Sequence, residues 1–168
     1  MNKNIILCGF MGSGKTVTGK SLANRLNMDF IDIDTFIEEQ EKTSINDIFE
    51  KKGEEYFRSL ETKAAITLGN LQNTVISCGG GTVLKQENLT ALKQNGEVFY
   101  LSVTPETVIK RLKNNSSRPL LAEDKEVKIK TLLKSRSPIY EGVADYVIDS
   151  NQTVVFAVEQ ILKILGEA

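Results

Sequence analysis

A glycine-rich segment near the N-terminus carries the residue types best suited to bind a nucleoside triphosphate. Residues 9–16 read G-F-M-G-S-G-K-T, which matches the spacing G-x-x-x-x-G-K-[ST] at every fixed position. Glycines here let backbone N–H groups point at phosphate oxygens, and a following helix N-terminus adds partial positive charge. The spacing predicts that Lys15 reaches the β- and γ-phosphates and that the Thr16 hydroxyl binds Mg²⁺. The predicted nucleotide-binding residues of this loop are Gly12, Ser13, Gly14, Lys15 and Thr16.

The flanking sequence has the pattern that such a loop requires. Residues 5–8 are an apolar run typical of a short buried strand, and residues 17–26 carry apolar side chains at helical spacing. The alternative is a chance glycine turn before a helix. A strand, a complete glycine motif and a helix in this order favour the phosphate-binding loop.

Composition narrows the classes of function. The 168 residues include 21 basic and 22 acidic side chains, a net charge of −1, and no long basic run predicts a nucleic-acid surface. The chain has no histidine, which excludes Ser-His and Cys-His nucleophile pairs and His-ligated zinc. The N-terminal apolar run is too short for a secretory signal or a membrane span, so we expect a soluble, cytoplasmic protein without a membrane partner.

The two cysteines also point to a reducing compartment. Cys8 and Cys78 lie in apolar runs, and we expect both to be small, buried thiols. A redox switch is the alternative.

Apolar strands alternate with helical segments along the chain. This alternation predicts an α/β fold in which helices cover both faces of a parallel sheet. The strand candidates are residues 3–8, 29–33, 74–78, 97–103 and 145–149. Helix starts are expected at the S-I-N-D capping box of residues 44–47 and at Thr104-Pro105, and the last helix is expected to end at Gly166.

Three segments interrupt this alternation and are expected to serve the site. Residues 34–70 are longer than one crossover needs, with breaks near residues 43–44 and at Gly53, so we expect a lobe beside the phosphate loop. Residues 113–125 are polar and contain one proline and one arginine, which is typical of a lid. Residues 79–81 are three glycines at the carboxyl end of a predicted strand, where they can bring backbone amides against a ligand.

Arginine placement indicates an anionic substrate. Only five of the 21 basic residues are arginine, and three of them draw attention by position: Arg58 lies in the 34–70 segment, Arg118 in the 113–125 segment, and Arg136 just ahead of Pro138. A guanidinium group binds a carboxylate or phosphate through two parallel hydrogen bonds. Structural ion pairs or helix-end cations are the alternative for each. Arg25 is expected to be a surface residue.

Two aspartates end the second predicted strand in F-I-D-I-D. Asp32 and Asp34 are two residues apart and would share one face of the strand at its carboxyl end, where α/β sheets bind ligands. The alternative for Asp34 is an N-cap of a helix that begins at Thr35.

In their order and spacing, these motifs resemble those of the shikimate kinase family, in the nucleoside-monophosphate-kinase branch of P-loop proteins. The resemblance covers nearly the whole chain and rests on G-F-M-G-S-G-K-T, F-I-D-I-D, G-E-E-Y-F-R-S-L-E, the triple glycine, R-P-L-L and R-S-P-I-Y. It implies one three-layer P-loop domain with a five-stranded parallel sheet in the order 2-3-1-4-5. It also implies a substrate-binding insertion at about 34–70, a lid at about 113–125 and a monomeric state.

The resemblance further implies an activity and residue roles. The enzyme would transfer the ATP γ-phosphoryl group to the 3-hydroxyl of shikimate, with Mg²⁺, in chorismate and aromatic amino acid biosynthesis. Lys15, Asp34 and Arg118 would be catalytic, Thr16 and Asp32 would bind the metal, and Arg111, Arg118, Asn151, Gln152 and Thr153 would bind ATP. Shikimate would contact Asp34, Arg58, Glu61, Gly79, Gly80, Gly81 and Arg136, with both arginines on its carboxylate and Glu61 orienting Arg58. Ser77 and Cys78 stand where such enzymes often carry a threonine.

Two other functions fit parts of the pattern. A kinase for gluconate or a nucleotide would share the glycine loop, but it has less use for two arginines and a triple glycine around a carboxylated polyol. A non-catalytic nucleotide switch would need loops that sense the γ-phosphate and a partner surface, and the guanine-reading N-K-x-D motif is absent from the sequence.

Overall fold

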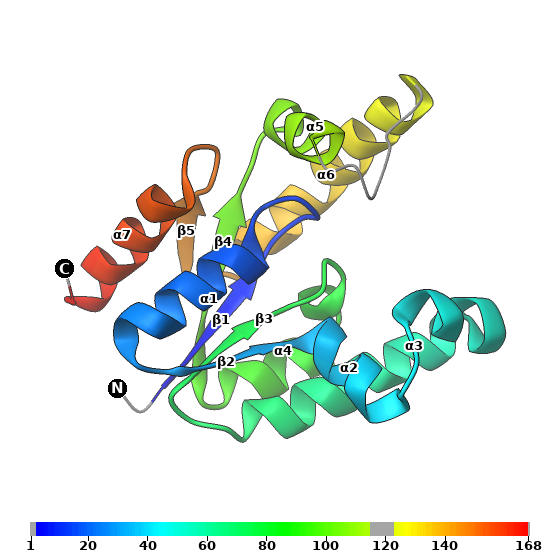
Figure 1. The fold of residues 1–168 in the computed structure, drawn as a ribbon, viewed down its shortest axis with the longest axis horizontal. Helices are drawn as coiled ribbons and strands as arrows, with labels where there is room; N and C mark the ends of the chain where they lie inside the picture. The colour runs from blue at the N-terminus through cyan, green and yellow to red at the C-terminus, as the bar shows by residue number, and fades with distance from the viewer. Residues whose placement is uncertain (1–2, 115–122, 168) are drawn as a thin grey trace.

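The structure, a computed structural model, describes residues 3–114 and 123–167 (Figure 1). Strands alternate with helices along these residues, as the sequence predicts. The strands are β1 (Asn4–Cys8), β2 (Asp29–Asp32), β3 (Thr74–Ser77), β4 (Gly96–Ser102) and β5 (Tyr146–Asp149). The helices are α1 (Lys15–Leu26), α2 (Ile33–Glu41), α3 (Ile45–Gly69), α4 (Gln86–Lys93), α5 (Pro105–Lys113), α6 (Glu123–Val143) and α7 (Val154–Leu165), with a 3₁₀ turn, η1 (Thr82–Leu84).

The five strands form one parallel sheet in the order β2-β3-β1-β4-β5, which confirms the predicted topology. The central strand is β1, whose Ile6 pairs with Ile76 of β3 and Val98 of β4. All five residues of β1 are buried because helices cover both of its faces. Parallel strands end at the same edge, so the glycine loop after β1 and the triple glycine after β3 lie at the same end of the sheet.

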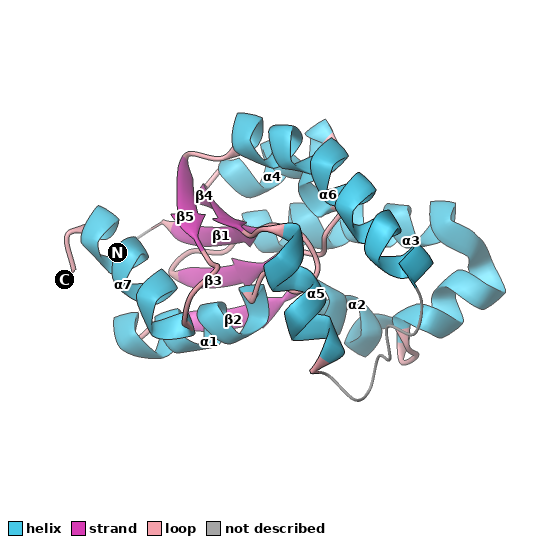
Figure 2. Cartoon of the chain, turned by 90° about the horizontal axis from the view of Figure 1, so that it is seen from above, coloured by secondary structure: helices cyan, strands magenta, loops and turns pink. Residues whose placement is uncertain are grey.

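Two hydrophobic cores hold the helices on opposite faces of the sheet (Figure 2). Alternate residues of β1 point to each, since side chains along a strand alternate between faces. On one face, α1 and α7 contribute Leu22 and Ile161 to the core that contains Ile5 and Leu7. On the other, α3, α4 and α6 contribute Leu68, Leu92 and Leu133 to the core that contains Ile6 and Ile76.

Helix ends fall where local sequence signals place them. The Ser44 hydroxyl accepts a hydrogen bond from the Asp47 backbone N at 3.1 Å and caps α3, and Thr104 caps α5 in the same way ahead of Pro105. Gly166 ends α7 with a φ of 74°. No helix among the described residues has both the length and the apolar character that a membrane span needs.

The first of the unusual segments takes a clear position. Residues 34–70 form most of α2 and all of α3, and the predicted break at Gly53 is a kink inside α3 with φ 83° and ψ 171°. The first part of α3 extends well beyond the sheet (Figure 1). Residues 115–122, the middle of the predicted lid, lie outside the described part of the chain. At the ends of this segment, Lys113 of α5 pairs with Glu126 of α6 at 2.7 Å.

Candidate active site

The loop between β1 and α1 has a backbone that depends on glycine. Gly9, Gly12 and Gly14 have φ values of 147°, 75° and 87°, which other residues rarely adopt. Gly14 is the N-cap of α1, and no side chain there satisfies the first-turn N–H groups. These N–H groups, together with the helix dipole, make the N-terminus of α1 suited to bind phosphate.

The Lys15 side chain lies against this loop. Its Nζ donates hydrogen bonds to the carbonyl oxygens of Gly9 at 2.8 Å and Phe10 at 3.0 Å. Burial lowers the pKa of the ammonium group, and the nearby Cys78, Cys8, Asp34 and Asp32 oppose that shift. The loop therefore contains a cation that is already partly desolvated, which strengthens its attraction to an anion.

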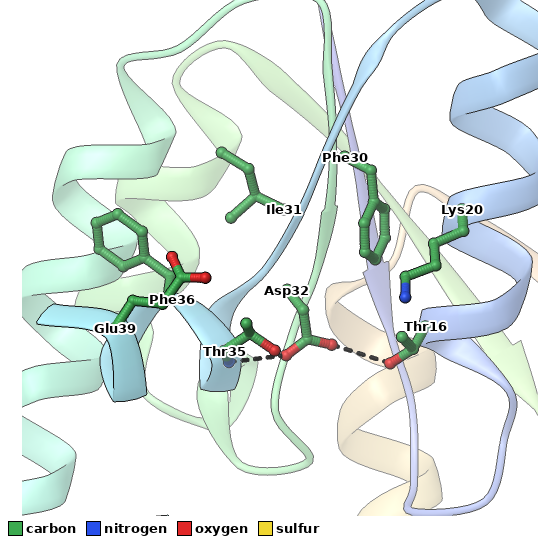
Figure 3. A pocket seen from close by; sticks show the side chains of 8 residues that line it. All are labelled: Thr16, Lys20, Phe30, Ile31, Asp32, Thr35, Phe36 and Glu39. Atoms are coloured by element: carbon green, nitrogen blue, oxygen red, sulfur yellow. Dashed lines mark hydrogen bonds between the residues drawn. The ribbon is translucent and has the colours of Figure 1, made fainter. Parts of the chain in front are cut away.

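Thr16 and Asp32 form a second polar pair next to the loop (Figure 3). The Thr16 hydroxyl donates to Asp32 Oδ2 at 2.9 Å. A hydroxyl and a carboxylate oxygen are ligands that Mg²⁺ prefers, and this ion is usually bound by one or two protein groups together with phosphate and water. The donor set of this pair therefore fits Mg²⁺. A cavity of about 310 Å³ opens beside the pair, between α1 and α2.

The other oxygen of Asp32 determines where α2 begins. Asp32 Oδ1 accepts hydrogen bonds from the backbone N of Asp34 at 3.0 Å and of Thr35 at 3.2 Å. Asp32 is thus the N-cap, and the helix begins at Ile33. The interpretation of Asp34 as N-cap of a helix starting at Thr35 is wrong, because the chain turns into the helix two residues earlier.

Asp34 lies in the first turn of α2 and not on the strand, which ends at Asp32. The prediction that the two aspartates share a strand face is therefore wrong. Asp34 instead faces the triple glycine: a methyl group at Gly79 would lie 3.0 Å from Asp34 Oδ1. That oxygen is buried and has no hydrogen-bond partner among the described residues.

Burial and neighbouring charge together perturb Asp34. Burial raises its pKa to about 6, repulsion from Asp32 and Glu61 adds to the rise, and Lys15 opposes it. A buried carboxylate with an unpartnered oxygen gains by accepting a hydrogen bond from a ligand hydroxyl.

Arg58 is held by a buried carboxylate. Its Nη1 donates to Glu61 Oε2 at 2.6 Å, and Glu61 is 1% exposed. The other oxygen, Glu61 Oε1, accepts from the Thr82 hydroxyl at 2.8 Å, and Thr82 is fully buried. Both Glu61 oxygens are therefore satisfied, and the Arg58 guanidinium has a fixed direction while it remains partly exposed.

Gly81 leaves room for Arg58, and Arg136 lies beside Gly80 at ordinary contact distance. A methyl group at Gly81 would lie 2.5 Å from Arg58 Nη1, and one at Gly80 would lie 3.6 Å from Arg136 Nη1. Gly81 has a φ of −101°, which any residue can adopt, so glycine is needed at this position for space. Two guanidinium groups from α3 and α6 thus meet at the loop that follows β3.

Comparison with known protein families identifies the family of this chain. The family model described as shikimate kinase matches residues 11–166 of the chain. The chain belongs to the shikimate kinase family. A shikimate kinase from Caldanaerobacter subterraneus subsp. tengcongensis is 45% identical over 163 residues, 96% of this chain and 95% of that protein. One from Sulfurihydrogenibium sp. is 47% identical over 160 residues, 95% of this chain and 96% of that protein.

Solved structures agree with this family assignment. The shikimate kinase from Acinetobacter baumannii in complex with shikimate has a TM-score of 0.88 and 39% identity, covering 97% of this chain and 92% of that chain. A gluconokinase from Sinorhizobium meliloti has a TM-score of 0.59 at 13% identity, covering 98% of this chain and 91% of that chain. The gluconokinase likeness shows a shared fold only.

In this member of the shikimate kinase family, Arg111 connects the phosphate loop to the turn after β5. Its guanidinium donates to the carbonyl oxygens of Gly12 at 2.9 Å, Ser150 at 2.5 Å and Gln152 at 3.2 Å. Two side chains of the turn have structural partners: Asn151 Oδ1 accepts from the Thr104 backbone N, and Thr153 caps α7. The structure thus brings Arg111 and residues 151–153 together at the rim of the loop.

The remaining predicted residues divide into three groups. Arg118 lies outside the described residues. Arg25 is exposed and pairs with Glu159 at 3.2 Å, which confirms a surface residue. Cys8 and Cys78 are free and buried, as expected, and burial raises the pKa of Cys8 to about 12 and that of Cys78 well above its usual value, so both are protonated thiols.

Two buried residues of this candidate site were not predicted from the sequence. Thr82 directly follows the triple glycine and bonds Glu61, and Tyr140 donates to the Gly80 carbonyl oxygen. Tyr140 lies four residues after Arg136, within the quoted motif R-S-P-I-Y, so the helical spacing was a usable signal. Nothing local marks Thr82, whose partner is 21 residues earlier.

Proposed function

We propose that this chain is an ATP-dependent kinase that converts ATP and shikimate to ADP and shikimate 3-phosphate. One observation carries the proposal: two guanidinium groups and a buried carboxylate converge on three glycines beside a phosphate-binding loop. A carboxylated polyol offers one anion for the arginines and several hydroxyls for the aspartate and the loop. Membership of the shikimate kinase family and the likeness to a relative solved with shikimate support the same substrate.

The substrate carboxylate would bind between Arg58 and Arg136. Guanidinium groups pair with carboxylates through charge-assisted hydrogen bonds, and Glu61 keeps Arg58 pointed at the substrate. Asp34 and the backbone N–H groups of residues 79–81 would bind ring hydroxyls. We expect the 3-hydroxyl to lie near Asp34, on the side of the phosphate loop.

The nucleotide would bind along the loop after β1. Gly12, Ser13, Gly14, Lys15 and Thr16 would surround the phosphates, and Arg111 with residues 151–153 would contact the adenine end. Thr16 and Asp32 would hold Mg²⁺, which neutralises negative charge on the phosphates when bound. Lys15 would leave the carbonyl oxygens of Gly9 and Phe10 and donate to the phosphates.

The reaction would depend on alignment and charge. In phosphoryl transfer through a loose transition state, little bonding to the nucleophile has formed at the barrier. We therefore expect Asp34 to contribute mainly by aiming the 3-hydroxyl, and to receive its proton as the new O–P bond forms. Lys15 and Arg118 would neutralise charge on the transferring group.

The same proposal includes the organisation of the chain. Residues 34–70 would be the substrate-binding insertion and residues 113–125 a lid over the phosphates, within a single domain. The charge balance and the two buried thiols are compatible with a cytoplasmic monomer whose only partners are small molecules.

A coupled assay of ADP formation tests the proposed function. Shikimate, gluconate and a nucleoside monophosphate are compared with ATP and Mg²⁺, and the product is identified by ³¹P and ¹H NMR. We expect ADP formation with shikimate alone of the three, and a phosphate on its 3-oxygen. Equal turnover with gluconate would support the gluconate kinase, and ATP binding without any substrate-stimulated turnover would support the nucleotide switch.

A further inference from the structure

Tyr140 occupies the point where α6 meets the triple glycine. It is fully buried, and its Oη donates to the carbonyl oxygen of Gly80 at 2.5 Å. A methyl group at Gly80 would lie 3.9 Å from this hydroxyl and 3.6 Å from Nη1 of Arg136. Arg136 is one helical turn before Tyr140 on α6, so the hydroxyl that bonds Gly80 and the guanidinium beside Gly80 come from the same helix.

The ring of Tyr140 also packs against the sheet. It stacks on Tyr100 of β4, with ring centroids 5.2 Å apart and planes 27° apart. Burial raises the pKa of Tyr140 to about 12, against a hydrogen bond and the charge of Arg136, so the hydroxyl keeps its proton at any working pH. A neutral phenol held between a strand and a loop is a stable donor to the Gly80 carbonyl.

This contact joins two parts of the site that are far apart in the sequence. The triple glycine follows β3, whereas Arg136 belongs to α6, which begins beyond residues 115–122. A shift of about 1 Å in one binding group relative to another can lower activity about 10²-fold. Substrate binding therefore requires a contact that keeps the distance between Arg136 and the triple glycine constant.

We propose that Tyr140 is a positioning residue, whose hydroxyl fixes Arg136 and the Gly79–Gly81 loop relative to each other for substrate binding. The inference rests on the proposed function, since it assigns Arg136 to the substrate carboxylate. It assigns Tyr140 no contact with the substrate: the side chain acts through Arg136 and Gly80.

The first test is Tyr140→Phe, with Tyr100→Phe as the matched control. Both substitutions remove a hydroxyl from a buried, stacked ring, but the Tyr100 hydroxyl lies 3.5 Å from Ser137 Oγ, at the limit of a hydrogen bond. We expect Tyr140→Phe to raise the KM and the calorimetric Kd for shikimate about tenfold. The Gly80 carbonyl loses its donor, and the loop is then no longer hydrogen-bonded to α6 through this residue. The KM for ATP should stay within about twofold in both variants, and Tyr100→Phe should keep its shikimate KM.

The second test asks whether Tyr140 acts through Arg136. In an Arg136→Ala background, adding Tyr140→Phe should raise the shikimate Kd less than threefold, instead of about tenfold, because coupled residues give non-additive effects. Three results would overturn the positioning role. Tyr140→Phe could weaken shikimate and ATP binding equally, or Tyr100→Phe could have the same effect as Tyr140→Phe. The effects of Tyr140→Phe and Arg136→Ala on the shikimate Kd could also be additive. Wild-type protein that neither binds nor phosphorylates shikimate would instead refute the proposed function, and this inference with it.

Discussion

Replacing Gly81 with alanine should displace Arg58 without changing any charge in the site. The new methyl group would lie 2.5 Å from Nη1, 3.1 Å from Cζ and 3.2 Å from Nη2 of Arg58, whereas ordinary contact begins at 3.4 Å. The guanidinium must therefore move by about 0.9 Å (3.4 − 2.5). The backbone at this position, with φ −101° and ψ −9°, accepts alanine without strain, so the effect arises at the arginine.

The size of the effect follows from the contacts that this shift disrupts. Arg58 donates to the buried Glu61 at 2.6 Å, and a charge-assisted hydrogen bond of this kind contributes about 1.5–3 kcal/mol. Misplacing a binding group by about 1 Å can cost about 10²-fold. We expect the KM for shikimate to rise by about 10- to 100-fold, with the KM for ATP within about twofold of wild type, because the phosphate loop is a separate segment.

Steady-state kinetics with each substrate varied in turn measure this effect. Gly142→Ala is the matched control, since a methyl group at this exposed helical position meets no atom within 4 Å. That variant should keep both KM values and be as stable as wild type or slightly more stable. A shikimate KM for Gly81→Ala within twofold of wild type would refute the placement of Arg58 as part of the substrate site.

Four further predictions concern three charged residues. Arg58→Lys keeps the charge but loses the two parallel guanidinium donors, so calorimetry should show shikimate binding weaker by about 1.5–3 kcal/mol and unchanged ATP binding. Unchanged shikimate affinity would mean that Arg58 serves only as a structural ion pair. Asp34→Asn should lower kcat at least ~10²-fold, and near-normal turnover would contradict the aiming role. Because folding raises the pKa of Asp34 from 3.8 to about 6, its ionisation costs stability as pH rises through that range. Without Mg²⁺, the free energy of unfolding of Asp34→Asn should therefore exceed that of the wild type by about 1–3 kcal/mol at pH 7.5. Below about pH 4 the two should not differ, and denaturant titrations at both pH values measure this. Arg118→Ala should lower kcat and kcat/KM together by roughly 10²- to 10⁴-fold with shikimate Kd nearly constant, and single-turnover kinetics with a normal chemical step would exclude a catalytic role.

Much of the fold could be predicted from the sequence. The strand order agrees with the family resemblance, and the breaks at residues 43–44 and at Gly53 were visible because caps and glycines act within a few residues. Asp34 was misplaced because two signals competed in F-I-D-I-D. A period of two fits a strand, but the Asp32 side chain captures two backbone N–H groups and starts a helix there.

Residues that hold the site through tertiary contacts were harder to predict. Arginine placement singled out Arg58 and Arg136, yet the contacts that orient them come from other elements. Thr82 of η1 bonds Glu61 of α3 through a buried contact between residues 21 positions apart, and Tyr140 reaches Gly80 from a helix 60 residues later. Such partners depend on how the elements pack, which spacing along one segment does not encode.

The central claim is that Arg58, Arg136 and Asp34 hold a carboxylated substrate against the triple glycine, within reach of a nucleotide on the phosphate loop. A crystal structure with ADP, Mg²⁺ and shikimate tests it most directly. We expect the shikimate carboxylate between the two guanidinium groups and its 3-hydroxyl within hydrogen-bond distance of Asp34, on the side facing the phosphates. Shikimate bound elsewhere, or with its carboxylate on neither arginine, would contradict the account.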